Sequence, residues 1–328
     1  MASAHTYTLI ALTDIWTGSV RLEERNGQLR ERIVPERLIT TGLLGSIRWW
    51  FEVLVRGLGS SACDPTQTEC QDRGHCVVCE LFGCTGWARK FRFEVLEKDE
   101  KVHVAQIKKD QDDGIFKLRF TELRPVKPEE WALLDLTLRF IADYGAIGGK
   151  TVLKPSDEPS RANAAHHDYG LIEIQQRPEK IPSLTRKKLE EYVSPREWRT
   201  LDHDGFRWAS LENFWYVKGR YLARQSTDKS SFNRVVGRKE PKNQGRHLRT
   251  GASDLEKWLA GHQRESKKVF SFKYPESARR TFGFVPSTDN LGEMRQRLKY
   301  KAWKDLGDDE FLDGGAILAR LLSAGGTR

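Results

Sequence analysis

The sequence predicts an α+β protein with two domains. The chain has 328 residues, roughly twice the usual length of one domain. Strand-like and helix-like segments alternate through its first half, whereas the second half differs in composition and has more turns. All five cysteines lie between Cys63 and Cys84. We therefore expect an N-terminal domain at residues 1–175 with a cysteine-rich insertion at about 60–84, and a C-terminal α+β domain at residues 176–328.

The elements of the N-terminal domain follow from hydrophobic periodicity. Residues 7–12 are expected to form the opening strand, and a polar loop after it has room for a short hairpin. Apolar side chains then recur at helical spacing from Leu43 to Leu58, behind a cap at Thr40. The opposite side of this helix carries charged residues four positions apart, which we expect on its surface: Arg48, Glu52 and Arg56.

A second helix is expected to begin at Pro128, because proline suits the first helical position and the acids after it suit the helix dipole. It should stop near Gly145. Alternating apolar residues predict further strands at 90–96, 102–107, 115–120 and 171–174. This order of strands and helices resembles a ferredoxin-like split βαβ fold.

In the C-terminal domain the clearest signal is a capping box, Ser253-Asp254-Leu255-Glu256, which predicts the start of a helix. Other expected elements lie at 269–274, 282–285, 294–303 and 317–322. Their spacing does not define how they are connected in space.

The composition excludes several classes of protein. Hydrophobic residues make up 38% of the chain, with 15 Phe and 10 Trp, which suffices for a core and excludes a disordered chain, a collagen or a coiled coil. Mean hydropathy is -0.62, and no apolar run approaches the ~20 residues of a membrane span. The N-terminus lacks the basic start of a signal peptide. We expect a soluble, cytoplasmic protein.

The spacing of the cysteines predicts a structural zinc site. Two residues separate Cys76 from Cys79, a spacing that lets two thiolates reach one tetrahedral ion. Cys63 and Cys70 are the expected second pair. The polar segment between the pairs could not be ordered by burial, so a metal would supply the ordering energy. His75 and Cys84 are alternative ligands. Reduced thiols in a loop are the simpler interpretation, and a catalytic zinc is disfavoured because four ligands leave no open position.

Positive charge indicates a nucleic-acid partner. Lys and Arg number 55 against 46 Asp and Glu, a net charge of +9. Ten of the cations lie between Lys218 and Arg249, in a tract with two acidic residues, which suits a phosphate backbone or, alternatively, a solvated loop. A second basic stretch lies beside Trp87, a side chain that either stacks on bases or packs in the core. The predicted RNA contacts of the two regions are Arg220, Arg224, Arg234, Arg238, Arg89, Lys90 and Arg92.

The signals for catalysis are weak. Gly149-Lys150-Thr151 matches the end of a phosphate-binding loop, but Tyr144 stands where that motif needs a glycine. His166 and His167 could act as a general acid–base pair, and Asp14 could join an acidic site, although no partner for it is evident. The sequence therefore predicts a binding protein without catalytic residues.

Three segments together resemble the RAMP superfamily of CRISPR proteins, and most closely the first-numbered subunit of the type III-B Cmr effector complex. They are the helix Thr40–Phe51 with its Gly-x-Ile-Arg-Trp-Trp run, the Leu-Phe-Gly segment at 81–87, and the glycine-rich loop at 145–150. The resemblance covers about residues 5–175. Cys84 stands where the family commonly has Ser, which argues against it as a zinc ligand.

The resemblance implies two ferredoxin-like domains in a protein that caps the crRNA 3′-end side of the complex, in antiviral defence. Such a protein would hold the guide RNA and the guide–target duplex by their backbones without cutting, beside other Cmr-type subunits. It implies an RNA-facing Arg48, for which an ion pair with Glu52 on the helix surface is the simpler interpretation. It also implies phosphate contacts from the glycine-rich loop and its basic end, namely Gly148, Gly149, Lys150 and Lys154. Two alternatives are a RAMP endoribonuclease that uses Asp14 or His166/His167, and a zinc-stabilised protein-interaction module.

Overall fold

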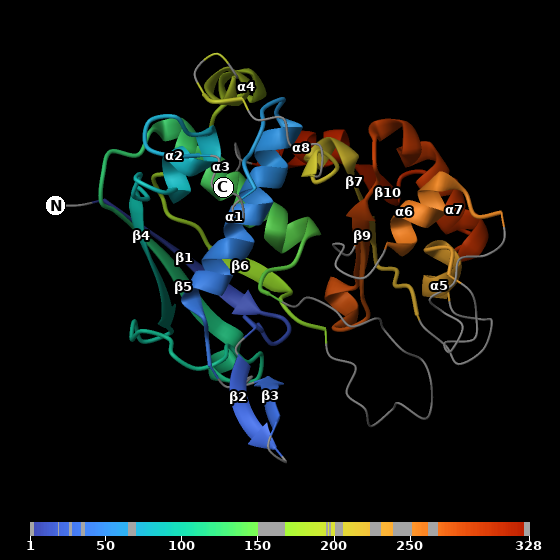
Figure 1. Cartoon of the computed structure of the whole chain (residues 1–328), viewed down its shortest axis with the longest axis horizontal. Helices are drawn as coiled ribbons and strands as arrows, with labels where there is room; N and C mark the ends of the chain where they lie inside the picture. The colour runs from blue at the N-terminus through green and yellow to red at the C-terminus, as the bar shows by residue number, and fades with distance from the viewer. Residues whose placement is uncertain are drawn as a thin grey trace. The chain divides into compact units, whose positions relative to one another are not determined.

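The computed structural model describes residues 3–18, 37–64, 70–149, 168–194, 196, 198–200, 206–223, 231–238, 251–261 and 268–324, and the backbone of 20–25 and 28–33. The chain forms two compact units (Figure 1). Unit 1 comprises residues 1–151, 169–203 and 321–328, and unit 2 comprises residues 152–168 and 204–320. The sequence expectation places the boundary near residue 175, whereas residues 169–203 all lie in unit 1.

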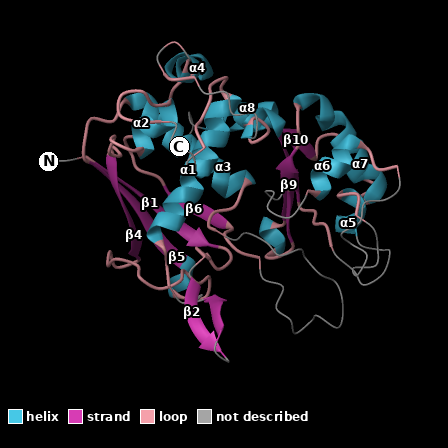
Figure 2. Ribbon diagram, viewed as in Figure 1, coloured by secondary structure: helices cyan, strands magenta, loops and turns pink. Residues whose placement is uncertain are grey.

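Unit 1 contains a four-stranded antiparallel sheet in the order β4-β5-β1-β6. Chain order is strand, helix, two strands, helix, strand, so the unit has the predicted ferredoxin-like α+β topology (Figure 2). Its elements are β1 (Ala4–Ala11), a hairpin of β2 (Val20–Arg25) and β3 (Gln28–Ile33), α1 (Thr40–Gly57), α2 (Val77–Phe82), β4 (Phe91–Glu97), β5 (Ile115–Glu122), α3 (Pro128–Tyr144), β6 (Ile172–Gln176) and α4 (Arg186–Val193).

Two expectations for unit 1 are wrong in detail. Residues 102–107 form no strand, because β4 pairs directly with β5 and this segment meets its neighbours only through isolated bridges, such as Leu96 to Val102. Thr40 is the first residue of α1 and not its cap. The cap position is Ile39, whose N–H donates to the Thr17 hydroxyl at 2.7 Å. This backbone N–H is therefore satisfied by a residue 22 positions away, and no described side chain caps the helix locally.

The sheet of unit 1 has one packed face and one polar face. Along β1, Tyr7 and Leu9 are fully buried whereas Thr6 and Thr8 are half-buried, the alternation expected of a strand. The buried set packs with the helices, where Trp50 of α1 meets Phe140 of α3 with ring centroids 5.0 Å apart. The apolar periodicity of the sequence thus predicts the core of this unit.

Unit 2 repeats the same topology. Its sheet has the order β10-β7-β9-β8, and all its pairings are antiparallel. Ser253 caps α6 in the predicted capping box. The elements are β7 (Phe214–Lys218), α5 (Ser231–Val235), α6 (Asp254–Ala260), β8 (Val269–Phe272), β9 (Arg280–Phe284), α7 (Leu291–Lys301), β10 (Phe311–Asp313) and α8 (Gly314–Ser323), whose last residues belong to unit 1.

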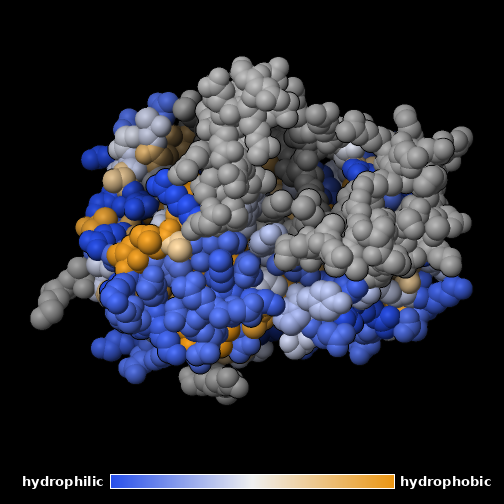
Figure 3. Space-filling model, turned by 90° about the horizontal axis from the view of Figure 1, so that it is seen from below, coloured by the Kyte–Doolittle hydropathy of each residue, from blue (hydrophilic) through white to orange (hydrophobic). Residues whose placement is uncertain are grey.

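The described surface is mostly hydrophilic in the view from below, with small hydrophobic patches (Figure 3). The most exposed apolar side chains are Val104 at 70% and Tyr300 at 73%, and they lie far apart in the sequence. Among the described helices, none is both long enough and apolar enough to cross a membrane.

Candidate metal centre and nucleic-acid contacts

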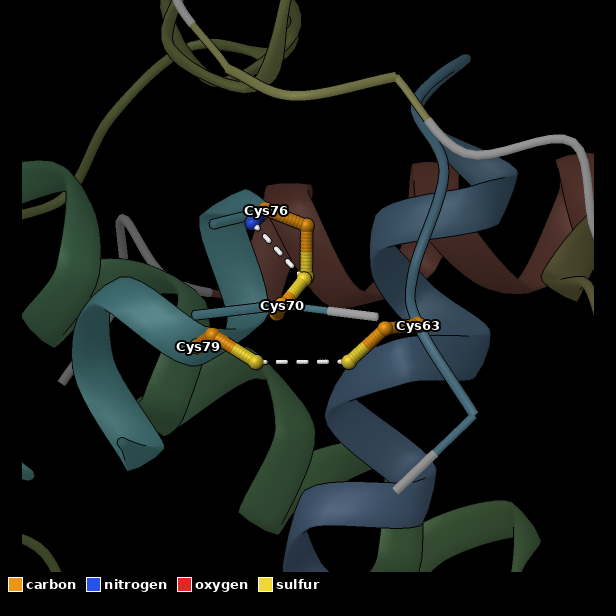
Figure 4. A group of neighbouring side chains, drawn as sticks. All are labelled: Cys63, Cys70, Cys76 and Cys79. Carbon is orange, nitrogen blue, oxygen red and sulfur yellow. Dashed lines mark hydrogen bonds between the residues drawn. The ribbon is translucent and has the colours of Figure 1, made fainter. Parts of the chain in front are cut away.

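Four cysteines from the chain segment that joins α1 to β4 meet in unit 1, beside α1 and α2 (Figure 4). Cys63 and Cys70 come from the loop after α1, Cys76 holds the cap position of α2, and Cys79 lies in the first turn of that helix. All four are buried, and their sulfur atoms lie within 4.8 Å of one another. Four buried thiols this close together could hold a metal ion, and they are the four that the sequence singles out.

The sulfur geometry fits a tetrahedral ion better than a disulfide. The Cys63 and Cys79 sulfurs are 3.3 Å apart, well beyond the ~2.05 Å of a disulfide bond. A tetrahedral zinc with Zn–S bonds of ~2.3 Å holds its sulfurs about 3.8 Å apart. The backbone N–H of Cys76 donates to the Cys70 sulfur at 3.3 Å, a contact that stabilises a thiolate. The donor set therefore fits a divalent, thiolate-preferring metal.

The two alternative ligands lie outside this group. The His75 ring has Nε2 2.7 Å from a Glu80 oxygen, and its Nδ1 contacts the carbonyl of Asp72. Both ring nitrogens of His75 therefore have partners. Cys84 is half-exposed and exchanges backbone hydrogen bonds with Trp87.

The close approach of the four thiols shifts their pKa values in different directions. Hydrogen bonds with Cys76 and Cys79, together with burial, raise the pKa of Cys63 above its usual range. Hydrogen bonds from Cys63, Cys70 and Cys79 hold the pKa of Cys76 below its usual range. Without a cation, one thiolate is stabilised by its neighbouring thiols, because adjacent negative charges disfavour a second ionisation. A bound divalent cation removes this restriction.

The charged side of α1 faces the cysteines and not solvent, which corrects the expectation for Arg48. This guanidinium, 16% exposed, donates to Glu52 at 3.0 Å and to the sulfurs of Cys63 and Cys79 at 3.4 and 3.2 Å. Burial alone would lower the pKa of Arg48, but Glu52 and the two cysteines raise it above its usual value. Arg48 thus has its hydrogen-bond partners inside unit 1.

Glu52 and Arg56 complete a buried charged row along α1. Glu52 is 3% exposed and lies 3.8 Å from the Arg56 guanidinium, which also donates to the carbonyl of Ala62. Burial raises the pKa of Glu52 to about 7, although Arg56 and Arg48 oppose the shift. The cysteine loop covers this side of the helix, so charges that i, i+4 spacing places on a surface become internal.

Lys90 is also internal, contrary to its prediction as an RNA contact. Lys90 is 5% exposed, and its ammonium lies 2.8 Å from Glu130 and 2.5 Å from Glu80. Tyr192 of α4 donates a hydrogen bond to the same Glu130 carboxylate at 2.8 Å. Burial and the Glu130 charge raise the pKa of Tyr192 well above its usual range. Lys90 therefore neutralises two buried carboxylates and is not available to a phosphate.

The glycine-rich loop uses its backbone donors within the protein. Gly148 N–H donates to the Ser46 hydroxyl at 3.0 Å, Gly149 N–H to the Trp16 carbonyl at 2.9 Å, and Ile147 N–H to the Gly170 carbonyl at 2.8 Å. Gly148 is required because its φ is +108° and a Cβ would lie 2.7 Å from the Trp16 carbonyl. In this conformation the N–H groups of Gly148 and Gly149 already have partners, so the phosphate contacts expected of them would require the loop to exchange these hydrogen bonds. Lys150 and Lys154 lie outside the described residues.

The remaining residues of unit 1 that could contact RNA differ in how exposed they are. The Trp87 ring packs 4.6 Å from the His75 ring and 4.4 Å from the Arg124 guanidinium, so it serves as packing. Arg92 is exposed and pairs with Glu94 on the polar face of the sheet. Arg89 is half-buried.

In unit 2 the described part of the basic tract is partly neutralised. Arg220 lies between two carboxylates, 2.8 Å from Glu310 and 2.9 Å from Asp305. Arg238 donates to the carbonyl of Ala260, and Arg234 is half-buried. Lys218 is exposed at the end of β7. The remaining six cations of the tract lie outside the described residues, namely Arg224, Lys229, Lys239, Lys242, Arg246 and Arg249.

The candidate catalytic residues are not assembled among the described residues. The Asp14 carboxylate accepts a hydrogen bond from the Lys109 backbone at 3.0 Å, which is a structural contact. Asp168, which directly follows His166 and His167 in the sequence, accepts hydrogen bonds from the N–H groups of Lys273 and Tyr274. His166 and His167 lie outside the described residues.

Comparison with known proteins supports the resemblance of the N-terminal half. Residues 8–153, less than half of the chain, match the family model of the RAMP superfamily. This match confirms the RAMP resemblance of that region, which contains all three motifs. No curated protein matches the chain.

Several solved structures are similar in fold at low identity. Cmr1 from Pyrococcus furiosus in its apo form is 12% identical with a TM-score of 0.40, covering 86% of this chain and 88% of its own. A chain of a Type IV-B CRISPR complex is 12% identical with a TM-score of 0.32, covering 58% of this chain and 100% of its own. A chain of the Csm3-Csm4 subcomplex of the type III-A CRISPR-Cas interference complex is 13% identical with a TM-score of 0.27, covering 58% and 93%. Likenesses this distant assign no function.

Proposed function

We propose that this protein is a non-catalytic, RNA-binding RAMP subunit of a type III-B CRISPR effector complex. It would cap the crRNA 3′-end side and act in antiviral defence in the cytoplasm, beside other Cmr-type subunits. The observation that carries the proposal is the RAMP match over residues 8–153. A ferredoxin-like sheet in each unit agrees with it.

The mode of RNA binding that we propose is contact with the phosphate backbone. In RNA-guided complexes base pairing reads the sequence, so the protein needs shape and positive charge and not base-reading side chains. The net charge of +9 suits this role. Arg48, Lys90 and Arg220 have partners within the protein. The proposed contacts are therefore Arg89, Arg92, Lys150, Lys154, Arg224, Arg234 and Arg238, together with the cations at the end of the basic tract.

We propose that Zn²⁺ is the ion held by Cys63, Cys70, Cys76 and Cys79. Four thiolates favour zinc over harder cations, and a closed set of four ligands suits a structural role. When bound, the ion would supply ordering energy to the loop between α1 and α2. The four buried sulfurs within 4.8 Å of one another support this proposal.

The test is binding of the purified full chain to a labelled single-stranded RNA across a salt series, with the RNA examined on a gel afterwards. We expect intact RNA and an affinity that falls steeply with salt, by about 0.7 in log–log slope for each phosphate contact. Cleavage at defined positions, lost in a His167→Ala variant, would replace the proposal with the endoribonuclease. Binding that vanishes at physiological salt would favour the protein-interaction module.

A further inference from the structure

Arg48 is in hydrogen-bond contact with two of the cysteine sulfurs. Its Nη2 lies 3.4 Å from the Cys63 sulfur and 3.2 Å from the Cys79 sulfur. Its Nη1 donates to the carbonyl of Gly83 at 3.0 Å, just beyond the C-terminal end of α2. One guanidinium therefore joins α1 to the loop before α2, to α2 itself and to the residue after α2.

A metal bound by four thiolates leaves a buried charge that the protein must balance. A divalent ion with four thiolate ligands carries a net charge of −2, and burying an uncompensated charge is costly. The groups that donate hydrogen bonds to the ligands also fix their orientation and tune the metal. Three of the four sulfurs accept such hydrogen bonds here. Arg48 donates to the sulfurs of Cys63 and Cys79, and the backbone N–H of Cys76 donates to the sulfur of Cys70.

We infer that Arg48 is a positioning residue of the metal centre. It holds the Cys63 and Cys79 thiolates in place, balances part of the charge of a divalent tetrathiolate and couples metal binding to the packing of α1 on α2. This inference rests on the metal site of the proposed function. It places a motif residue that the family resemblance assigns to the RNA face at the metal centre.

The chain offers a matched control in Arg139 on α3. Its Nε donates to Asp135 at 2.9 Å with i, i+4 spacing, as Arg48 does to Glu52, and its Nη1 donates to a backbone carbonyl, that of Leu321. Arg139 is 11% exposed, close to the 16% of Arg48. It has no contact with a cysteine sulfur. Replacing either arginine removes an ion pair and a carbonyl contact, but only Arg48→Met removes the two sulfur contacts.

The experiment measures metal binding by the full chain and its Arg48→Met, Arg48→Lys and Arg139→Met variants. Zinc affinity comes from competition with a chromophoric chelator, and the thiolate environment from the charge-transfer bands of bound Co²⁺. We expect Arg48→Met to lose about tenfold to a hundredfold in zinc affinity and to shift the Co²⁺ bands to lower energy, because thiolates without hydrogen bonds donate charge more readily. Arg48→Lys should recover part of the zinc affinity and part of the band shift. Arg139→Met should match the wild type in both measurements.

The other possible outcomes of this experiment also test the inference. Wild-type zinc affinity and an unshifted Co²⁺ spectrum in Arg48→Met would overturn the inference while leaving the metal site intact. Absence of metal binding by the wild-type chain would overturn the metal site and the inference together. If Arg48→Met does not fold, an unshifted Co²⁺ spectrum and wild-type affinity in Arg48→Lys overturn the inference, and a partial loss supports it.

RNA binding provides the second readout. Because Arg48 lies against the cysteines, metal-loaded Arg48→Lys and Arg48→Met should bind RNA with the wild-type salt slope. A slope reduced by about 0.7 would mean that the variant binds one phosphate fewer, and would return Arg48 to the RNA face.

Discussion

The two units share one strand order but differ in the crossover between their first and second strands. In unit 1 the crossover from β1 to β4 contains α1, a helix of 18 residues, and the four buried cysteines. In unit 2 the crossover from β7 to β8 contains two short helices, of 5 and 7 residues, and the basic tract. The same position in one fold thus carries a candidate metal centre in one unit and a surplus of cations in the other.

This difference shows that the number of cations in a segment does not by itself indicate an RNA contact. In the first crossover Arg48, Arg56 and Lys90 all contact buried carboxylates or thiols. In the second, ten Lys or Arg share the tract with only two acidic residues. Cations that have internal partners stabilise the fold, whereas cations in excess of their acids remain for a polyanion.

Removing the metal should have the largest effect and should separate the two crossovers. We expect Cys79→Ser to destabilise unit 1 strongly, because binding free energies of structural zinc sites are about 10 kcal/mol or more and appear as folding free energy. Thermal unfolding of the full chain with and without a chelator measures this. Cys84→Ser is the control, since Cys84 is not one of the four clustered cysteines and serine keeps a hydrogen-bonding group beside Cys79. An equal loss in both variants would contradict the metal site.

Lys90→Met should have the next largest effect. It leaves the Glu80 and Glu130 carboxylates buried without their ammonium partner, and breaking a buried pair costs about 3–5 kcal/mol. Denaturant unfolding gives the free energy difference. Arg92→Met removes a cation from the same stretch at an exposed position, where we expect a change within about 0.5 kcal/mol. Equal effects in the two variants would show that Lys90 is not internal.

A pair of alanine substitutions tests how the apolar side of α1 is packed. At Gly145 a Cβ would lie 2.8 Å from the Trp50 ring, so Gly145→Ala should cost about 1–3 kcal/mol through overpacking. At Gly45 on α1 a Cβ meets no atom within 4 Å, so Gly45→Ala should stabilise the helix by about 0.5–1 kcal/mol. Opposite shifts in melting temperature are expected, and shifts of the same sign would contradict this packing.

Neutralising the basic tract should change binding and leave stability unaltered. Replacing Lys239, Lys242, Arg246 and Arg249 by Gln should lower RNA affinity by about tenfold or more and reduce the salt slope by about 0.7 for each phosphate that the variant no longer binds. Fluorescence anisotropy with labelled RNA measures both quantities. An unchanged slope would show that the tract is a solvated loop and that the phosphate contacts lie elsewhere.

Much of the fold follows from local patterns in the sequence. The apolar stripe from Leu43 to Leu58 places α1, Pro128 starts α3, and Ser253 caps α6. The Cys76–Cys79 spacing identifies the cysteine cluster. Each of these patterns spans only one short segment of the chain, so it can be recognised without knowing how distant segments pack.

The partners of the charged residues could not be predicted in the same way. Arg48 meets Gly83, which is 35 residues away, and Lys90 meets Glu130, which is 40 residues away. Nothing in the local spacing distinguishes these buried cations from Arg92, which is exposed. A partial signal exists for Arg48, because it shares α1 with Glu52 and precedes a cysteine-rich insertion, but the direction of its side chain depends on how that insertion folds back.

The most direct test of the central claim is hydrogen–deuterium exchange of the full, metal-loaded chain with and without single-stranded RNA. The claim is that the cysteine-rich part of the first crossover is structural and that the second crossover binds RNA. We predict that RNA adds protection to peptides from residues 218–250 and leaves peptides from residues 70–84 unchanged. Protection of residues 70–84, with none in 218–250, would contradict the claim.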